Sequence, residues 1–254
     1  MIAIDFLTSF ARRSVAGARV RPFGLDVADL AIDFDAPRPI AATRVLAACL
    51  RSEEDPVWAL AVQTRILLLL GISELSLADP IEVHLPCACG ATAIVELSTS
   101  ELADFTVERR REDLTIHAGD AHATLRLPTG RDQLRWMQMT GEDDVARAVL
   151  SELVVEGDKP LSDALVTAAD ALLTDVDPLI ELEVESTCPQ CAKALAKQVD
   201  LERVALTRLR NARRILLEQV HAIASTYHWT EATIAELPAW RRAEYAALAE
   251  ARRR

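Results

Sequence analysis

Four of the five cysteines in this chain lie in two close pairs, and paired thiols at such spacing either bind metal ions or carry out redox chemistry. The first pair is Cys87 and Cys89, in Pro-Cys-Ala-Cys-Gly, and the second is Cys188 and Cys191, in Thr-Cys-Pro-Gln-Cys. Two such pairs that face each other offer four thiolates at the corners of a tetrahedron, the geometry of a structural zinc site. We therefore predict one structural zinc ion bound by Cys87, Cys89, Cys188 and Cys191.

The segments around the two pairs are alike. An alternating, strand-like run precedes each pair, at residues 81–85 and 180–184, and a second segment containing Ile, Val or Leu follows it. This pattern predicts two knuckles, turns that present two thiols from adjacent backbone positions. The gap between the pairs is longer than in most local zinc fingers, but the matching context of the two halves favours a single shared site.

Three other interpretations of these residues stay open. The cysteines could be buried thiols without a metal. His84, in His-x-x-Cys-x-Cys, could replace one cysteine as a ligand, although a strand histidine without a metal is favoured. Finally, a strand followed by Cys188-Pro-Gln-Cys191 and a helical segment from Ala192 is how a thioredoxin or glutaredoxin site begins. That fold needs further strands after the helix, and it leaves the upstream cysteine pair unexplained.

No enzyme motif accompanies the cysteines. The sequence lacks His-Glu-x-x-His, Gly-x-Ser-x-Gly and the Walker motif, and it has no His-x-Glu upstream of Cys188 of the kind that zinc deaminases use. Thr129 and Asp132 resemble a capping box at a helix start, and we favour this structural interpretation over an anion site. We therefore expect a protein that is not an enzyme.

Composition favours a globular protein that binds other proteins. The chain has 254 residues, half of them apolar, and a net charge of −11. The basic residues are concentrated after residue 200, so an acidic body carries a basic tail, which suits a protein partner or self-association better than nucleic acid. The first ten residues lack a signal-peptide pattern, and paired thiols fit a reducing compartment, so we expect a cytoplasmic protein.

The predicted fold is α+β, with a small antiparallel β region that carries both zinc knuckles, packed against helices, and a long C-terminal helical extension. We divide the chain into an N-terminal arm with helices (1–80), a zinc-knuckle body (81–200) and the helical extension (201–254). Residues 1–40 are expected to form a loosely packed arm, with a short helix at 2–13. Apolar spacing and capping residues predict helices at 41–51, 55–70 with a stop at Gly71, 143–155, 162–173 and 200–227.

The C-terminal tail is rich in the residue types that dominate protein interfaces. We predict partner contacts at His228, Trp229, Leu237, Trp240, Arg241, Arg242 and Tyr245. In the alternative interpretation, Trp229, Leu237 and Tyr245 simply pack the terminal helices together. The helix–turn–helix outline also raises DNA binding, but no helix begins with base-reading residues and the body is acidic.

Two stretches resemble a known family. Residues 221–238 contain His228-Trp229, then Ile234, then Leu237-Pro238. With the basic residues and Tyr245 that follow, this skeleton resembles a recurrent element of contractile tail systems, found in small tail-assembly proteins and at the ends of baseplate proteins. Residues 125–132, upstream of Cys-Pro-x-Cys, resemble the T4-like baseplate hub or hub assembly chaperone family.

The resemblance covers roughly residues 80–254. It implies a non-enzymatic part or assembly factor of a phage-tail-like contractile injection machine. Its partners would be hub, baseplate or tape-measure proteins. Apart from the resemblance, the longest aliphatic run, residues 66–70, is too short to span a bilayer and the body is acidic, so we expect neither a membrane nor a nucleic acid as a partner.

Overall fold

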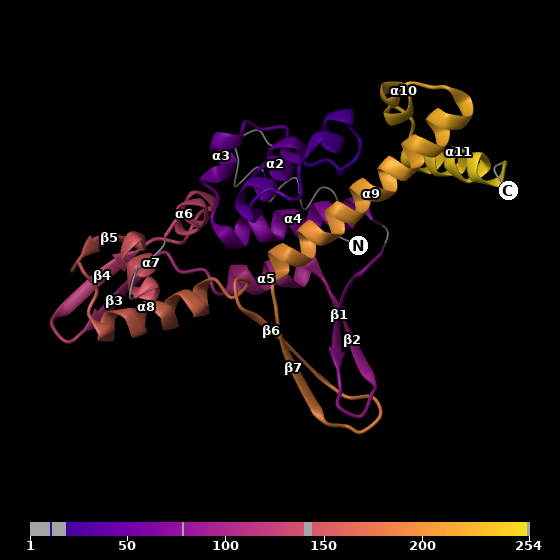
Figure 1. The fold of residues 1–254 in the computed structure, drawn as a ribbon. Coiled ribbons are helices and arrows are strands. Elements are labelled where there is room, and N and C mark those ends of the chain that lie inside the picture. The colour runs from indigo at the N-terminus through magenta and orange to yellow at the C-terminus, as the bar shows by residue number, and fades with distance from the viewer. Residues whose placement is uncertain (1–10, 12–18, 78, 140–143, 253–254) are drawn as a thin grey trace. The chain divides into compact units, whose positions relative to one another are not determined.

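Helices and small antiparallel sheets make up the computed structural model, which describes residues 11, 19–77, 79–139 and 144–252 (Figure 1). The predicted α+β class is confirmed, and the longest described helix, α9 (Leu201–Tyr227), lies in the C-terminal part of the chain. No described helix combines the length and the apolar character that crossing a bilayer requires. The predicted short helix at 2–13 lies almost wholly outside the described residues.

The chain forms two compact units. One consists of Met1–Val57, Leu68–Asp79 and Glu202–Arg254, and the other of Trp58–Leu67 and Pro80–Leu201. The segments before and after the cysteine-bearing region thus belong to one unit, and helix α4 (Val62–Ser76) contributes its first turns to one unit and the rest to the other.

All the regular elements in the described residues of the unit that holds both chain ends are helices. Its elements are the 3-10 helix η1 (Val27–Ala31), α2 (Arg38–Leu50), most of α3 (Glu54–Trp58), the later part of α4, nearly all of α9, α10 (Glu231–Ala235) and α11 (Ala239–Ala251). Large side chains on α2 and α4 are fully buried, among them Leu46, Leu50 and Leu69. A second apolar cluster joins α9 to α10 and α11 through Ile223, Ile234 and Ala249.

The prediction of a loosely packed N-terminal arm is wrong for residues 19–37. Phe23, Leu30 and other apolar side chains of this segment are buried. The buried carboxylate of Asp29 accepts hydrogen bonds from both terminal nitrogens of Arg21, each at 2.6 Å, and from the backbone N–H of Gly24 at 2.7 Å. The proline and glycine pairs that break regular structure here do not prevent packing, because side-chain burial and this ion pair hold the segment.

The single helix predicted for residues 55–70 is also wrong, because the structure has two helices, α3 and α4, in this region. The break falls where backbone groups bond to another segment: the N–H of Val62 donates to Pro128 O, and the N–H of Gly130 donates to Leu60 O. Gly71 does not end α4, which continues to Ser76. Ile72 and Ser73 are fully buried, so packing outweighs the weak helix preference of one glycine.

The other unit contains a three-stranded antiparallel sheet of β3 (Thr115–Ala118), β4 (Ala121–Leu125) and β5 (Val154–Gly157). Helix α8 (Asp163–Val176), capped by Ser162, packs against β3 and β4 over a buried apolar cluster. The helix predicted for 143–155 ends earlier, as α7 (Val145–Leu153). Its last two predicted residues enter β5 instead, because Val154 pairs with Leu125 of β4.

This unit also contains two shorter helices, α5 (Thr99–Glu108) and α6 (Gly130–Trp136), and the two hairpins that carry the paired cysteines. The predicted capping box at Thr129 is confirmed. The carboxylate of Asp132, only 1 % exposed, accepts the backbone N–H of Thr129 at 2.8 Å and its hydroxyl at 2.7 Å. It also accepts two hydrogen bonds from Arg126, at 2.6 and 2.8 Å, and one from Arg135. The Asp132 carboxylate therefore occupies the N-terminus of α6, the position that an external anion would need.

We expect Asp132→Asn to lower the free energy of unfolding by about 2 kcal/mol near pH 7. Although burial opposes ionisation, hydrogen bonds from Arg126 and Thr129 lower the pKa of Asp132 to about 2, from 3.8. Because the pKa is depressed in the folded protein, this stabilisation is present above about pH 4 and is lost as the pH falls towards about 2. Urea unfolding across this range measures the effect. The exposed Asp120→Asn is the control, and a pH-independent gap between wild type and Asp132→Asn would contradict the explanation.

Candidate metal centre

Two β-hairpins of equal length carry the paired cysteines. One pairs β1 (Ile81–Pro86) with β2 (Thr92–Leu97), and the other pairs β6 (Leu182–Thr187) with β7 (Ala194–Val199). The first strand of each hairpin runs directly into a cysteine. The hairpins lie side by side with their tips at the same end (Figure 1), with β1 beside β7 and β2 beside β6. The strand–knuckle–strand prediction is therefore confirmed for both pairs.

Backbone hydrogen bonds close each hairpin at its first cysteine. The N–H of Cys87 donates to Ala91 O, and the N–H of Cys188 donates to Lys193 O, both at 2.8 Å. Each turn includes a residue in the left-handed region: Gly90 has φ of 92° and Ala192 has φ of 56°. These turns bring the second cysteine of each pair back towards the first.

The four sulfur atoms form one compact cluster across the two hairpins. Cys87 Sγ lies 3.6 Å from Cys191 Sγ, and Cys89 Sγ lies 3.6 Å from Cys188 Sγ. All four sulfurs lie within 4.8 Å of one another. Tetrahedral coordination at a Zn–S distance of about 2.3 Å places sulfurs about 3.8 Å apart. These separations are far longer than a disulfide bond, and the four cysteines fit a structural zinc site.

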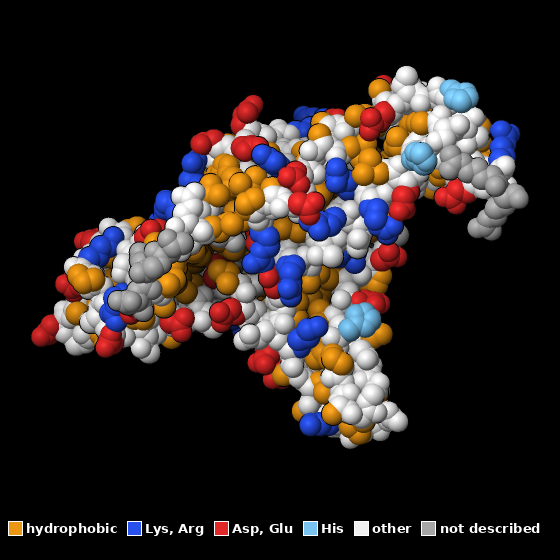
Figure 2. All heavy atoms as spheres, in the orientation of Figure 1, with side chains coloured by type: hydrophobic (Ala, Val, Ile, Leu, Met, Phe, Trp, Pro, Cys, Tyr) orange, Lys and Arg blue, Asp and Glu red, His pale blue; other side chains and the backbone are white. Residues whose placement is uncertain are grey.

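The two sulfur contacts each join one buried and one exposed cysteine from opposite hairpins. Cys87 and Cys188 are buried, whereas Cys89 and Cys191 are exposed. The space-filling view shows mainly uncharged atoms over the hairpin tips (Figure 2). A metal ion bound by all four would therefore be held equally by both hairpins, and each hairpin would contribute one ligand on the inner side and one at the surface.

Two of the four thiols have pKa values that are shifted in opposite directions. Hydrogen bonds from the N–H groups of Cys191 and Gln190 lower the pKa of Cys188 to about 6. The N–H of Ala91 lowers the pKa of Cys89, but the neighbouring thiols outweigh it and raise that pKa to about 11. All four sulfurs can be thiolates together only if a cation at the centre offsets their negative charges. Backbone N–H donors around metal-bound thiolates stabilise these charges further.

Neither His84 nor Cys49 belongs to the cluster. The exposed His84 side chain places Nε2 at 3.4 Å from the Glu82 carboxylate, and no histidine joins the four cysteines among the described residues. Cys49 is fully buried on α2, where burial raises the pKa of its thiol to about 12. Cys49 is therefore an unreactive core thiol.

The local structure after Cys191 differs from the redox interpretation. A thioredoxin-like site needs a helix that begins at its Cys-x-x-Cys, but Ala194–Val199 is strand β7, paired with β6. The low pKa of Cys188 therefore comes from the N–H groups of its own turn and not from a helix N-terminus. The upstream pair, which the redox interpretation leaves unexplained, provides the other half of the cluster.

The residues predicted to contact a partner divide into two groups in the structure. The rings of Tyr227, Trp229 and Tyr245 contact one another, with centroids 5.0 to 5.6 Å apart and Tyr245 edge-to-face with the other two, in the cluster that joins α9 to α11. Arg242 is buried and donates from Nε to Gln219 at 3.1 Å, and Leu237 is half-buried. The exposed members are His228, Trp240 and Arg241. Partner binding by all seven residues stays a prediction.

Nothing in the sequence marks Asp177 or the residues around it as a site. Asp177 is 3 % exposed, and burial raises the pKa of its carboxyl to about 7. In the sequence, Asp-Val-Asp-Pro marks only the end of a helix. Nothing local distinguishes a capping aspartate from one that long-range packing has buried.

Comparisons of the chain with protein-family models, curated proteins and solved structures found no match. The metal centre is therefore assigned from its own geometry.

We expect Cys87→Ser and Cys188→Ser to lose the metal and to lower the free energy of unfolding by several kcal/mol, because a structural zinc contributes its binding energy to folding. Metal analysis of the purified variants and chemical denaturation measure both effects. Cys49→Ala is the matched control, since it removes a buried cysteine outside the cluster and should keep one zinc per chain. If both serine variants unfold like the wild type, the two hairpins are not held together by a metal.

Substitutions at Gly90 and Ala192, the two turn residues with positive φ, should change the stability in opposite directions. Ala192→Gly should stabilise the zinc-loaded protein by about 1 kcal/mol, because alanine is strained at positive φ. Gly90→Ala should destabilise it by a similar amount through strain alone, since a Cβ there meets no atom within 4 Å. Thermal unfolding measures both, with zinc content as the control. Equal effects in the same direction would contradict the observed turn conformations.

Proposed function

We propose that this chain is a non-enzymatic structural or assembly protein whose body is held by a structural zinc, working in the baseplate of a phage-tail-like contractile injection system. The observation that carries the structural role is the four-sulfur cluster. Four protein ligands fill a tetrahedral zinc and leave no position for water or substrate, which is the arrangement of structural sites and not of catalytic ones.

The assignment to a contractile tail rests on the resemblance of residues 125–132 and 221–245 to baseplate and tail-assembly proteins. Hub, baseplate or tape-measure proteins are the partners that it implies. We assign the protein to the cytoplasm, because a zinc–thiolate centre requires reduced thiols.

The exposed side chains of helix α11 support a role in binding proteins. Trp240 is 65 % exposed and Leu248 is 56 % exposed, and they lie about 80° apart around the helix axis. The guanidinium of Arg241 lies 5.5 Å from the ring centre of Tyr245. Tryptophan and arginine are the residue types that contribute most to protein interfaces, and here both are accessible.

A thiol–disulfide oxidoreductase is the second candidate, and one observation favours it. Two backbone N–H groups lower the pKa of Cys188 to about 6. A free thiolate at neutral pH is the first requirement of dithiol exchange. Tightly bound zinc would hold this thiolate and suppress exchange, so metal content and thiol reactivity distinguish the two candidates.

We expect the zinc-loaded protein to form a stable complex when it is co-expressed with the hub, baseplate and tape-measure proteins of a contractile tail cluster. Trp240→Ala combined with Arg241→Glu should weaken that complex by about tenfold or more, because both side chains are exposed and belong to the residue types that contribute most to protein interfaces. Co-purification followed by a binding titration measures the loss.

Val155→Ala is the matched control, since Val155 is an exposed apolar residue on β5, outside the tail. It should leave the complex unchanged. A zinc-loaded protein that binds none of these tail components would overturn the baseplate assignment. Reversible cycling of Cys188 and Cys191 between dithiol and disulfide in the purified protein would instead put the oxidoreductase first.

A further inference from the structure

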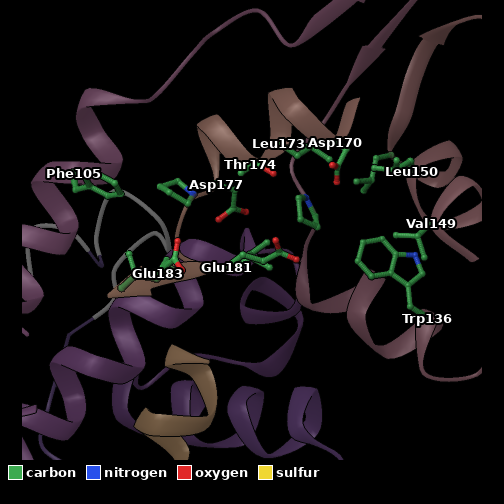
Figure 3. Close-up of a pocket in the computed structure, with 15 residues that line it drawn as sticks. Phe105, Trp136, Val149, Leu150, Asp170, Leu173, Thr174, Asp177, Glu181 and Glu183 are labelled. Carbon is green, nitrogen blue, oxygen red and sulfur yellow. The ribbon is translucent and has the colours of Figure 1, made fainter. Parts of the chain in front are cut away.

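A cavity of 340 Å³ lies in the same compact unit as the four-sulfur cluster but is built by different residues. Helices α5, α6, α7 and α8 and the segment that leads into β6 contribute to its walls. Figure 3 shows Asp177 near the middle of the lining residues, between Phe105 on one side and Trp136 and Val149 on the other. This volume is within the usual range for small-molecule sites.

The walls are mostly apolar. Hydrophobic side chains from several elements line the cavity, chiefly Phe105, Trp136, Leu150, Leu153, Leu173 and Ile180. The indole N–H of Trp136 already donates to the Glu152 carboxylate at 3.0 Å, which fixes the ring and leaves its face for contacts. Two aromatic rings in an apolar wall suit a ligand with a hydrophobic body.

Asp177 is the polar group that this wall leaves unsatisfied. Its side chain is 97 % buried by area, being 3 % exposed, and neither carboxylate oxygen has a hydrogen-bond partner among the described residues. A buried, unpartnered carboxylate is costly and is rare in folded proteins. Burial raises its pKa to about 7, so the carboxyl is partly protonated at neutral pH for lack of a cation.

All the charged side chains among the described lining residues are acidic. Three further carboxylates line it, from Asp170, Glu181 and Glu183, and all three are exposed. None of the described lining residues is basic. The nearby cations are engaged elsewhere: Arg109 lies over the Phe105 ring, 3.6 Å from its centre, and Arg111 pairs with Asp175. The carboxylates therefore attract a positively charged ligand and repel an anion.

We propose that this cavity binds a small organic cation, a protonated amine on an aromatic or alicyclic body. The ammonium group donates hydrogen bonds to the Asp177 carboxylate, and the apolar body packs against Trp136 and the neighbouring Leu150 (Figure 3). A charge-assisted hydrogen bond of this kind supplies the partner that Asp177 lacks. The inference is independent of the zinc site and of the baseplate assignment.

Two other cationic ligands fit less well. A bare divalent metal ion requires six or more oxygen ligands, and the four carboxylates that line the cavity do not come together as a metal-binding group among the described residues. One arginine side chain from a partner protein would satisfy Asp177 but would fill only part of the 340 Å³. The volume and the aromatic walls together favour a free small molecule.

Isothermal titration of the zinc-loaded full chain with three matched probes tests the proposal. The probes are 1-naphthylmethylamine, 1-naphthylmethanol and 1-naphthylacetate, which share a body and differ in charge. We expect the amine to bind at least about tenfold more tightly than the alcohol, and the acetate to bind weakest. Asp177→Asn keeps the shape of the side chain and should remove that preference while leaving alcohol binding unchanged.

Two variants control for position and folding. Asp120→Asn removes an exposed carboxylate in the β3–β4 turn and should leave the amine preference intact. Leu173→Trp fills the cavity while keeping Asp177, and should abolish binding of the amine and the alcohol alike. Circular dichroism confirms that each variant is folded before it is titrated.

Several results would overturn the proposal. Equal affinity for amine and alcohol in the wild type would remove the role of charge, and unchanged amine affinity in Asp177→Asn would place the amine elsewhere. Tighter binding of a short arginine peptide, N-acetyl-Ala-Arg-Ala-amide, than of the naphthyl amine would assign the cavity to a partner protein's side chain and not to a small molecule.

Discussion

The four-sulfur cluster is the contact on which the arrangement of the two hairpins depends. Each hairpin has only two strands, and most residues of β2, β6 and β7 are exposed or half-buried. A two-stranded hairpin with so little buried surface is marginally stable on its own. Backbone pairing fixes the register within each hairpin. Between the strands of the two hairpins, Lys197 Nζ donates a hydrogen bond to His84 O. Shared coordination supplies the missing stabilisation at the tips.

Three deeply buried aspartates outside the four-sulfur cluster differ in whether a counter-ion compensates for their burial. Asp29 is held by Arg21, and Asp132 by Arg126 with help from Thr129. In both places a bidentate guanidinium compensates for the loss of hydration. Asp177 is buried to a similar degree without such a partner among the described residues. This contrast is the reason that Asp177, and not the ion-paired aspartates, marks a binding cavity.

Cavity and metal centre are linked by one short segment of chain. Asp177 ends helix α8, Glu181 and Glu183 line the cavity as the chain enters β6, and β6 then leads to Cys188. The hairpin that supplies half of the sulfur ligands therefore begins at the cavity wall. A metal that fixes the hairpin tips also restrains the strand whose first residues form that wall.

Local chemistry in the sequence determined both hairpins, since period-two alternation and a cysteine turn need no distant partner to be recognised. It likewise determined the caps at Thr129 and Ser162 and the long helix from residue 201. The matching segments around the two cysteine pairs predicted that they share one site, but only the tertiary structure decided which sulfurs, 99 and 104 residues apart, lie next to each other. Tertiary structure alone also decided that α4 continues through Gly71 and that Val154 joins a strand. It also decided that Asp177 is buried without a counter-ion. These outcomes depend on which segments pack together, because burial and strand pairing override weak local preferences, and no pattern within one segment records its distant neighbours.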